Sequence, residues 1–234
     1  MIWLLDMLIP ATALSALAAC GLALLPKAAV RLRLNLALGG LIAWLVPWPW
    51  IRLPLPLPST VDASLAPLDV VLSALDPSAA VASPPQLYGW IAGAVIAFGA
   101  LFYARDLAAL RAAIAAWRAR SNSGERLRAL LPAELRATRA AIRVVAGSRV
   151  AAAAGWPRST IWVGDGFNEA DLRVALVHEC WHVRRRDPLL MPSVMLVRRL
   201  YWWNPLVAFL AGQALLLVEA ACDRRCVESR GAPR

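Results

Sequence analysis

The sequence predicts a mostly helical membrane protein in which three transmembrane helices precede a cytoplasmic α+β domain with a small antiparallel sheet. Of the 234 residues 60% are hydrophobic, yet the formal net charge is +10. This combination is typical of apolar spans with basic flanks. The N-terminal half contains apolar stretches long enough to cross a bilayer. The segment that follows them carries short β-like runs between helical patterns, which favours a small α+β domain.

The predicted spans are three apolar stretches of the N-terminal half. They cover residues 2–25, 34–50 and 87–103. The first contains a lipoprotein-like cleavage box ending at Cys20, but the positively charged start of a signal peptide is missing, so we expect an uncleaved span. The second ends in PWPW, whose tryptophans favour a membrane interface. In the third, Gly89 and Gly93 have the GxxxG spacing that lets helices approach, which allows a homodimer.

The loop charges predict the orientation of these spans. Lys27, Arg31 and Arg33 follow the first span, the 51–86 loop is weakly acidic, and the stretch after the third span is rich in arginine. The positive-inside rule therefore places the N-terminus and the 51–86 loop outside a bacterial inner membrane. The chain then divides into a transmembrane region, residues 1–104, and a cytoplasmic, partly membrane-embedded domain, residues 105–234.

Within the predicted cytoplasmic domain the pattern changes from helical to extended and back. Apolar residues recur at helical spacing over 105–120, so a helix continues the third span until SNSG breaks it. A further short helix is expected at 132–141. Short β-like runs bounded by glycines within 142–163 predict the antiparallel sheet. Asn168 is typical of an N-cap and opens the next helix.

Charge and cysteine content argue against two other classes of protein. The arginines lie along helical stretches near the spans, without interleaved aromatics, so no direct contact with nucleic acid is expected. Three of the four cysteines lie in the predicted cytoplasmic domain, where thiols stay reduced. Cys222 and Cys226 are four residues apart and so able to share a metal, but no second pair completes a tetrahedral site. Buried free thiols are therefore favoured.

The sequence VALVHECWHVRRRDP, which begins at Val174, contains both histidines of the chain. On a helix His178 and His182 lie one turn apart on the same face, where two imidazoles can bind one Zn²⁺. Glu179 is next to the first histidine and is positioned to act as a general base on water. The pattern predicts a zinc site, with a chance motif as the alternative.

A third ligand is expected from the helix that Asn204 and Pro205 open, since proline is favoured at the first helical position. Glu219 and Asp223 lie one turn apart near the end of this helix. Glu219 would complete a His-His-Glu set, and Asp223 would accept the free ring N–H of a liganding histidine. A solvated helix end is the alternative for this pair.

The membrane constrains this ligand set. If residues 200–218 crossed the bilayer, Glu219 would emerge about 30 Å from the histidines, on the other side. We therefore expect the two helices of the 189–218 stretch to be half-buried, at the cytoplasmic interface or packed between the spans. Trp202 and Trp203 suit an interfacial depth.

Several of these sequences resemble the BlaR/MecR-type integral-membrane zinc metallopeptidases. The resemblance rests on HECWHVRRRDP, on YWWNPLVA from Tyr201, on EAACD from Glu219, and on GWPRSTIWVG from Gly155. The three-span N-terminus with an outer loop is also similar. HtpX-like proteases share HExxH and a later glutamate, but the NPL and ACD segments favour the first family.

The resemblance implies a gluzincin-like fold in which His178, His182 and Glu219 bind Zn²⁺, Glu179 is the base and Asp223 supports a ligand. It also implies a signal-transducing endopeptidase that acts on a cytoplasmic or membrane protein, such as a transcriptional repressor or itself. Antibiotic sensors of the family carry a C-terminal penicillin-binding domain. The sequence ends eleven residues after Asp223, so we expect no such sensor and no β-lactam sensing.

Two features of the predicted reaction have only weak support in the sequence. The extended run from Ser159 to Val163 is a candidate edge strand for pairing with substrate. Tyr201 is a candidate to stabilise the oxyanion, on sequence proximity alone. A non-catalytic membrane transducer with a structural metal site is the principal alternative function, and a membrane-anchored DNA-binding protein is a weaker one.

Overall fold

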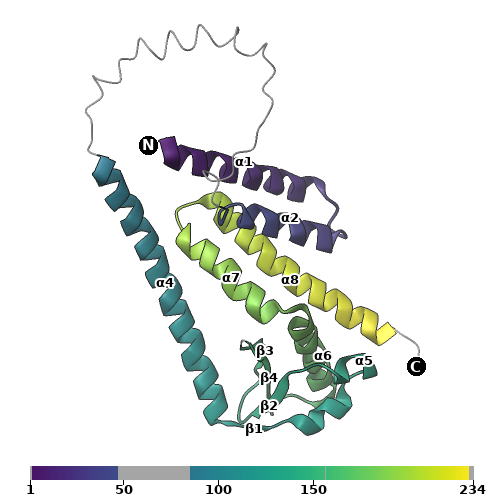
Figure 1. Ribbon diagram of the computed structural model, residues 1–234. Helices are drawn as coiled ribbons and strands as arrows, with labels where there is room; N and C mark the ends of the chain where they lie inside the picture. The colour runs from purple at the N-terminus through teal and green to yellow at the C-terminus, as the bar shows by residue number, and fades with distance from the viewer. Residues whose placement is uncertain (1, 47–84, 156, 232–234) are drawn as a thin grey trace, which may run out of the picture.

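The computed structural model describes residues 2–46, 85–155 and 157–231. Long helices form one part of the molecule, and a small sheet with shorter helices forms the other (Figure 1). The predicted outer loop up to residue 84 and the PWPW sequence lie outside the described residues. The elements in chain order are α1 (Ile2–Leu24), α2 (Val30–Ile42), α4 (Pro85–Ala119), β1 (Ser121–Ser123), the 3-10 helix η2 (Glu125–Leu130), α5 (Ala133–Arg136), β2 (Ala141–Val145), β3 (Ala151–Ala154), β4 (Thr160–Gly164), α6 (Glu169–Arg185), α7 (Asp187–Leu200) and α8 (Pro205–Gly231).

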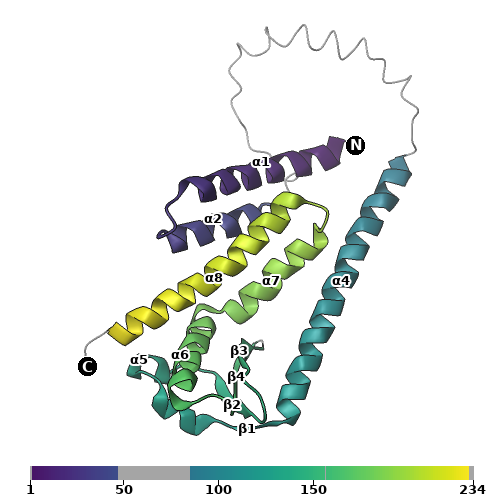
Figure 2. The same ribbon diagram turned by 180° about the vertical axis from the view of Figure 1, so that it is seen from behind.

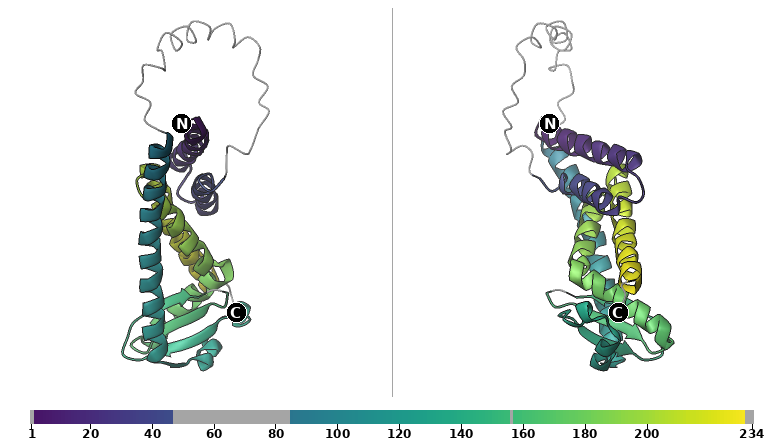
Figure 3. Two further views of the ribbon diagram at one scale, coloured as in Figure 1. Left: turned by 60° about the vertical axis from the view of Figure 1, so that its left-hand side comes forward. Right: turned by 90° about the vertical axis from the view of Figure 1, so that its right-hand side faces the viewer.

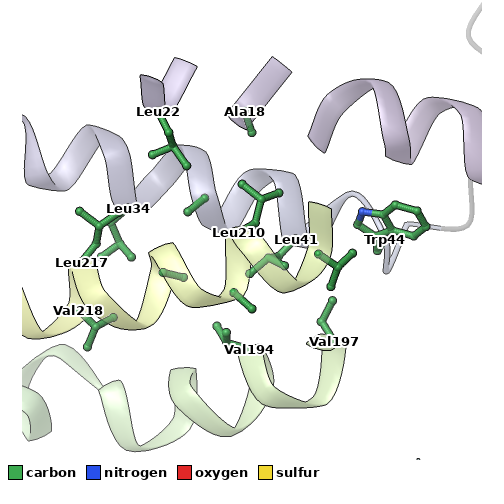
Figure 4. Packing of buried hydrophobic residues seen from close by; sticks show 14 of the residues in the cluster. Ala18, Leu22, Leu34, Leu41, Trp44, Val194, Val197, Leu210, Leu217 and Val218 are labelled. Atoms are coloured by element: carbon green, nitrogen blue, oxygen red, sulfur yellow. The ribbon is translucent and has the colours of Figure 1, made fainter. Parts of the chain in front are cut away.

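Helices α1, α2, α7 and α8 pack around one apolar cluster (Figure 4). Leu41, Val194 and Leu210 from three of these helices are all buried in it. At Gly40 a side chain would meet Leu210 and Ala18, so the glycine allows α2 to approach both α8 and α1 closely. This cluster fixes α8 relative to the N-terminal helices.

Helix α2 covers only part of the second predicted span, 34–50, whose last four residues lie outside the described residues. Helix α2 begins earlier, at Val30, and ends at Ile42. Its 13 residues extend about 20 Å, less than the thickness of a hydrocarbon core. The chain turns after the helix because Trp44 folds back onto α1, where its Nε1 donates a hydrogen bond of 2.8 Å to Ser15 Oγ.

Helix α4 is continuous from the third predicted span into the 105–120 stretch, as the sequence predicts. It approaches α7 closely at Gly99, whose missing side chain leaves room for the backbone of Arg199. Asp106 accepts a hydrogen bond of 2.7 Å from Arg199 Nε. Gly89 and Gly93 face open space in the described structure, so a homodimer through them stays a prediction.

The long helices expose extensive apolar surface. Within the described residues, Gly89–Ala119 and Pro205–Ser229 are long and apolar enough to cross a membrane, and Leu8–Leu24 is a shorter apolar helix. Large side chains such as Trp90 and Leu101 on α4 are mostly exposed. Apolar patches of this kind are unfavourable in water and typical of contact with lipid or a partner. The surface supports membrane association, while three spans and their orientation stay predictions.

The sheet is mixed, so the prediction of an antiparallel sheet is wrong. The strand order is β1-β2-β4-β3, with β2 and β4 parallel and the outer pairs antiparallel. The reason is that β4 inserts between β2 and β3, which are neighbours in sequence but not in the sheet. The short helix expected at 132–141 is also wrong in extent, since α5 has four residues and β2 begins at Ala141.

Helix α6 covers the sheet and connects it to the long helices. Ile142, Ile161 and Leu176 form part of an apolar cluster between α6, β2 and β4. In the views of Figures 1 and 2, α7 leads away from α6 and α8 returns beside it. The α7–α8 hairpin therefore extends from the sheet domain into the helical cluster and back.

The tight contact at Gly99 predicts a difference between two glycine-to-alanine substitutions in α4. Gly99→Ala should destabilise the protein by about 1–3 kcal/mol, because the new methyl group overlaps the α7 backbone. Gly93→Ala should be neutral or stabilising, because space is open there and alanine favours a helix. Thermal unfolding of both purified variants in detergent tests this. Equal stabilities would contradict the packing described.

Candidate metal centre

The motif helix α6 has a defined start. Asn168 caps it, because its Oδ1 accepts a hydrogen bond of 2.8 Å from the Asp171 backbone N–H. The cap predicted from the sequence is therefore confirmed. The helix continues to Arg185, so His178 and His182 lie on consecutive turns. Their ring centroids are 4.7 Å apart, and their side chains face α8.

The carboxylate of Glu219 reaches the histidines because α7 and α8 form a hairpin (Figure 3). Helix α7 carries the chain away over 14 residues. Helix α8 begins at Pro205, with Asn204 Oδ1 accepting hydrogen bonds from Leu206 N (2.9 Å) and Val207 N (3.2 Å), which confirms the predicted helix start. The return to Glu219 also takes about 14 residues, so the chain arrives back at the level of α6.

A bilayer-crossing stretch at 200–218 would therefore not by itself separate Glu219 from the histidines by about 30 Å, contrary to the constraint drawn from the sequence. Helix α8 is apolar enough to count as a candidate span, yet Glu219 lies beside both histidines. The position of Glu219 depends on the directions of two helices, α7 and α8. The preceding helix runs the opposite way, so the two displacements cancel. The alternative expectation, that both helices pack between the N-terminal helices, agrees with the apolar cluster.

Three donor atoms meet in a triangle, which we call the His-His-Glu cluster. His178 Nε2 lies 2.9 Å from His182 Nε2 and 3.3 Å from Glu219 Oε2, and the third side, from His182 Nε2 to Glu219 Oε2, is 3.5 Å. Ligands of a tetrahedral metal at about 2.0–2.1 Å lie about 3.3 Å from one another. The donor set therefore fits one divalent ion of zinc's size and chemistry. Glu219 is 48% exposed, so the cluster has an open side.

Each histidine has a carboxylate on its other ring nitrogen. His178 Nδ1 lies 3.1 Å from Asp223 Oδ1, the contact anticipated for Asp223. His182 Nδ1 lies 2.9 Å from Asp187 Oδ2. Such carboxylates fix the ring orientation and direct Nε2 toward a metal. The sequence reasoning missed Asp187, although it stands in the motif RRRDP, because it assigned no role to the end of α6.

The position of Asp187 depends on an unusual backbone conformation at Arg186. This residue has φ 64° and ψ 27°, the left-handed region in which glycine is favoured. It lies between α6 and α7, so the chain turns sharply there. The turn brings the Asp187 carboxylate to the Nδ1 atom of His182. Backbone strain of this kind concentrates at functional sites.

A second group of possible ligands shares His182. Asp187 Oδ2 and Cys222 Sγ both lie near His182 Nδ1, with the sulfur 3.4 Å from the ring nitrogen. All three side chains are buried, and Asp187 Oδ1 has no hydrogen-bond partner among the described residues. This group leaves no open coordination position, whereas the His-His-Glu cluster does. We therefore assign it the role of holding the His182 ring.

The electrostatics of His182 favour a positive charge at the ring. Burial lowers its pKa, but the hydrogen bond to Asp187 and the nearby Cys222 raise it, and the net result is a pKa of about 10. Arg185 Nε, 3.5 Å from Asp187 Oδ2, balances part of the local negative charge. The same surroundings that favour a proton on this imidazole favour a metal cation.

Glu179 lies between the cluster and the sheet. It is only 7% exposed, and burial raises the pKa of its carboxyl group, although both histidines and the Ala153 backbone N–H act in the opposite direction. A carboxylate with a raised pKa beside a metal site is suited to accept a proton from water near neutral pH.

Two predicted features of the site are wrong. Tyr201 is at the far end of α7, about 20 Å along the helix from Asp187, and its hydroxyl donates a hydrogen bond of 2.7 Å to the Trp44 carbonyl. It therefore lies far from any oxyanion. The Ser159–Val163 run cannot be an edge strand, because β4 pairs with β2 on one side and β3 on the other. The edge beside α6 belongs to β3.

Comparison with known proteins identifies the family. A family model described as BlaR1 peptidase M56 matches residues 58–232, about three quarters of the chain. The chain belongs to the BlaR1 peptidase M56 family. The regulatory protein BlaR1 of Bacillus licheniformis is 35% identical over 57 residues, which cover 24% of this chain and 10% of that relative.

Membership of the M56 family confirms the resemblance seen in the sequence. It indicates a membrane-associated metallopeptidase. The donor atoms of the His-His-Glu cluster give this M56 chain a group able to hold a metal. The similarity to the Bacillus protein covers a tenth of that protein's length, so its whole activity does not transfer with it.

The contact between His182 and Asp187 predicts that Asp187→Asn weakens metal binding. An amide cannot supply the negative charge that orients and polarises the ring, so affinity for Zn²⁺ should fall about 10- to 100-fold. Competition with a chromophoric chelator measures this affinity. Glu169→Gln, an exposed acidic residue at the start of the same helix, is the control and should bind as the wild type does. Equal affinity in Asp187→Asn would contradict the assigned role.

Proposed function

We propose that this M56 protein is a zinc-dependent endopeptidase of the bacterial inner membrane. His178, His182 and Glu219 would hold Zn²⁺, and Glu179 would be the general base. The observation that carries the proposal is the triangle of donor atoms with sides of 2.9, 3.3 and 3.5 Å beside a buried carboxylate. A zinc ion bound there supplies Lewis-acid polarisation of a peptide carbonyl and acidifies water.

The side chains around the His-His-Glu cluster orient the two imidazoles and transfer the proton. Asp223 and Asp187 hold the two imidazoles by their Nδ1 atoms, so that both Nε2 lone pairs face the same point. Glu179 takes a proton from the attacking water and delivers it to the leaving amine, which its raised pKa favours. The burial of Glu179 keeps bulk water from competing for that proton.

Among the described strands β3 lies at the edge of the sheet, and its free edge is suited to align an extended substrate. The hydrogen bond of 2.8 Å from Gly164 N to Val150 O fixes the pairing of β3 with β4. By alternation, the backbone groups of Ala151 and Ala153 point away from β4. The Ala153 N–H reaches Glu179, so this edge passes the proposed base. A peptide that adds a strand here would bring its backbone to the His-His-Glu cluster.

This geometry favours a protein substrate, and the partners are proposed with it. Candidates are a transcriptional repressor, another cytoplasmic or membrane protein, or the chain itself, with proteolysis on the cytoplasmic side. The matched relative is named a regulatory protein, which supports a signalling role. The exposed apolar faces of α4 and α8 support contact with the lipid bilayer. We propose no direct contact with nucleic acid.

The decisive variant is Glu179→Gln, which keeps the size of the side chain but removes its basicity. We expect the purified variant to bind about one Zn²⁺ per chain, as the wild type does, and to cleave casein or itself about 10²- to 10⁴-fold more slowly. Metal analysis and a cleavage assay on the same preparations measure both quantities. The exposed residue Glu169, changed to glutamine, serves as the matched control and should retain full activity.

Each alternative has its own result in this experiment. Equal cleavage by wild type and Glu179→Gln would exclude the proposed base. Bound zinc without turnover in the wild type would favour a non-catalytic transducer with a structural metal site. Loss of zinc from Glu179→Gln would place this residue among the ligands.

A further inference from the structure

A pocket of about 570 Å³ lies at the C-terminal end of α6. Its walls come from the α5–β2 link, the β3–β4 turn and the α6–α7 junction. The volume is within the range of binding pockets for small ligands or side chains, about 300–1,000 Å³. The His-His-Glu cluster is not part of its lining.

The pocket has a positive character. Arg139, Arg184 and Arg186 line it, against one acidic residue, Glu134. Among the described residues no carboxylate lies within ion-pair distance of the three arginines. Arg184 Nη1 donates a hydrogen bond of 3.2 Å to the Glu134 backbone carbonyl, and its guanidinium stacks on Trp181. Two guanidinium groups, those of Arg139 and Arg186, are therefore available to bind an anion.

Helix α6 and strand β3 both run from the proposed base, Glu179, toward the pocket. Val183 follows Glu179 by four residues and lies near the same stripe of α6, and Arg186, seven residues after Glu179, is the residue at which the helix ends. Along the helix they are about 6 and 10 Å from Glu179. The free edge of β3 ends at Ala154, and the next residue, Gly155, lines the pocket. Two separate elements thus lead from Glu179 to the same cavity.

We propose that this pocket is a substrate subsite that accepts an acidic side chain, Asp or Glu. An extended peptide advances about 3.3 Å per residue, so the acidic residue would be two or three positions from the scissile bond. Guanidinium groups bind carboxylates through paired hydrogen bonds, which suits arginine to this task. This inference rests on the proposed peptidase function and specifies the class of sequence that the enzyme prefers.

Internally quenched peptides test the subsite. One set carries Glu, Gln or Lys at each position in turn around the scissile bond, and kcat/KM is measured with full-length protein in detergent. We expect a preference for Glu over Gln of about five- to tenfold at one position. In the Arg139→Gln variant this preference should largely disappear while cleavage of the Gln peptide is retained.

Two further variants sharpen the test. Arg139→Glu should favour Lys over Glu at the same position. Arg173→Gln, an exposed arginine on α6 outside the pocket lining, should keep the wild-type preference. Anisotropy of fluorescein-labelled peptides bound to the Glu179→Gln variant gives a reading of the same preference without turnover.

The outcomes separate the subsite from the peptidase proposal. If none of the peptides is cleaved in a Glu179-dependent way, the peptidase function itself is contradicted. Cleavage without an acidic preference at any position, or with a preference that is undiminished in the Arg139→Gln variant, would overturn the subsite alone. So would a result in which these arginine substitutions weaken binding to phosphatidylglycerol vesicles but leave peptide binding unchanged, since the pocket would then hold a lipid headgroup.

Discussion

The structure depends on the convergence of donor atoms from two helices that are far apart in the sequence. Glu219 follows His178 by 41 residues, yet their ligand atoms lie 3.3 Å apart. Helices α7 and α8 make this possible because one carries the chain away and the other returns it over the same length. The apolar cluster with α1 and α2 fixes the path of α8. A shift of one helical residue along α8, about 1.5 Å, would already open the triangle.

Helix α4 connects the long helices to the sheet. It begins at Pro85, packs against α7 through Gly99 and the Asp106–Arg199 ion pair, and leads directly into β1. The sheet that β1 opens ends in β3, whose free edge passes Glu179. Arg199 in α7 pairs with Asp106, which reduces the cost of placing this charge among apolar helices.

Local patterns were predictable, and arrangements set by distant contacts were not. The His178–Glu179–His182 spacing and the caps at Asn168 and Asn204 depend on residues one turn apart, so the sequence predicts them. Strand order depends on β4 entering between β2 and β3, and β3 is a run of alanines with little strand propensity. The role of Asp187 depends on the left-handed backbone of Arg186. The sequence RRRDP does not predict this conformation, because arginine rarely adopts it.

The most direct measurement is the X-ray absorption spectrum of the zinc-loaded protein at the zinc edge. Binding by His178, His182 and Glu219 predicts only nitrogen and oxygen neighbours at about 2.0–2.1 Å, with the outer-shell pattern of two imidazoles. A sulfur neighbour at about 2.3 Å would contradict this account, because Cys222 and the buried group around Asp187 would then bind the metal instead.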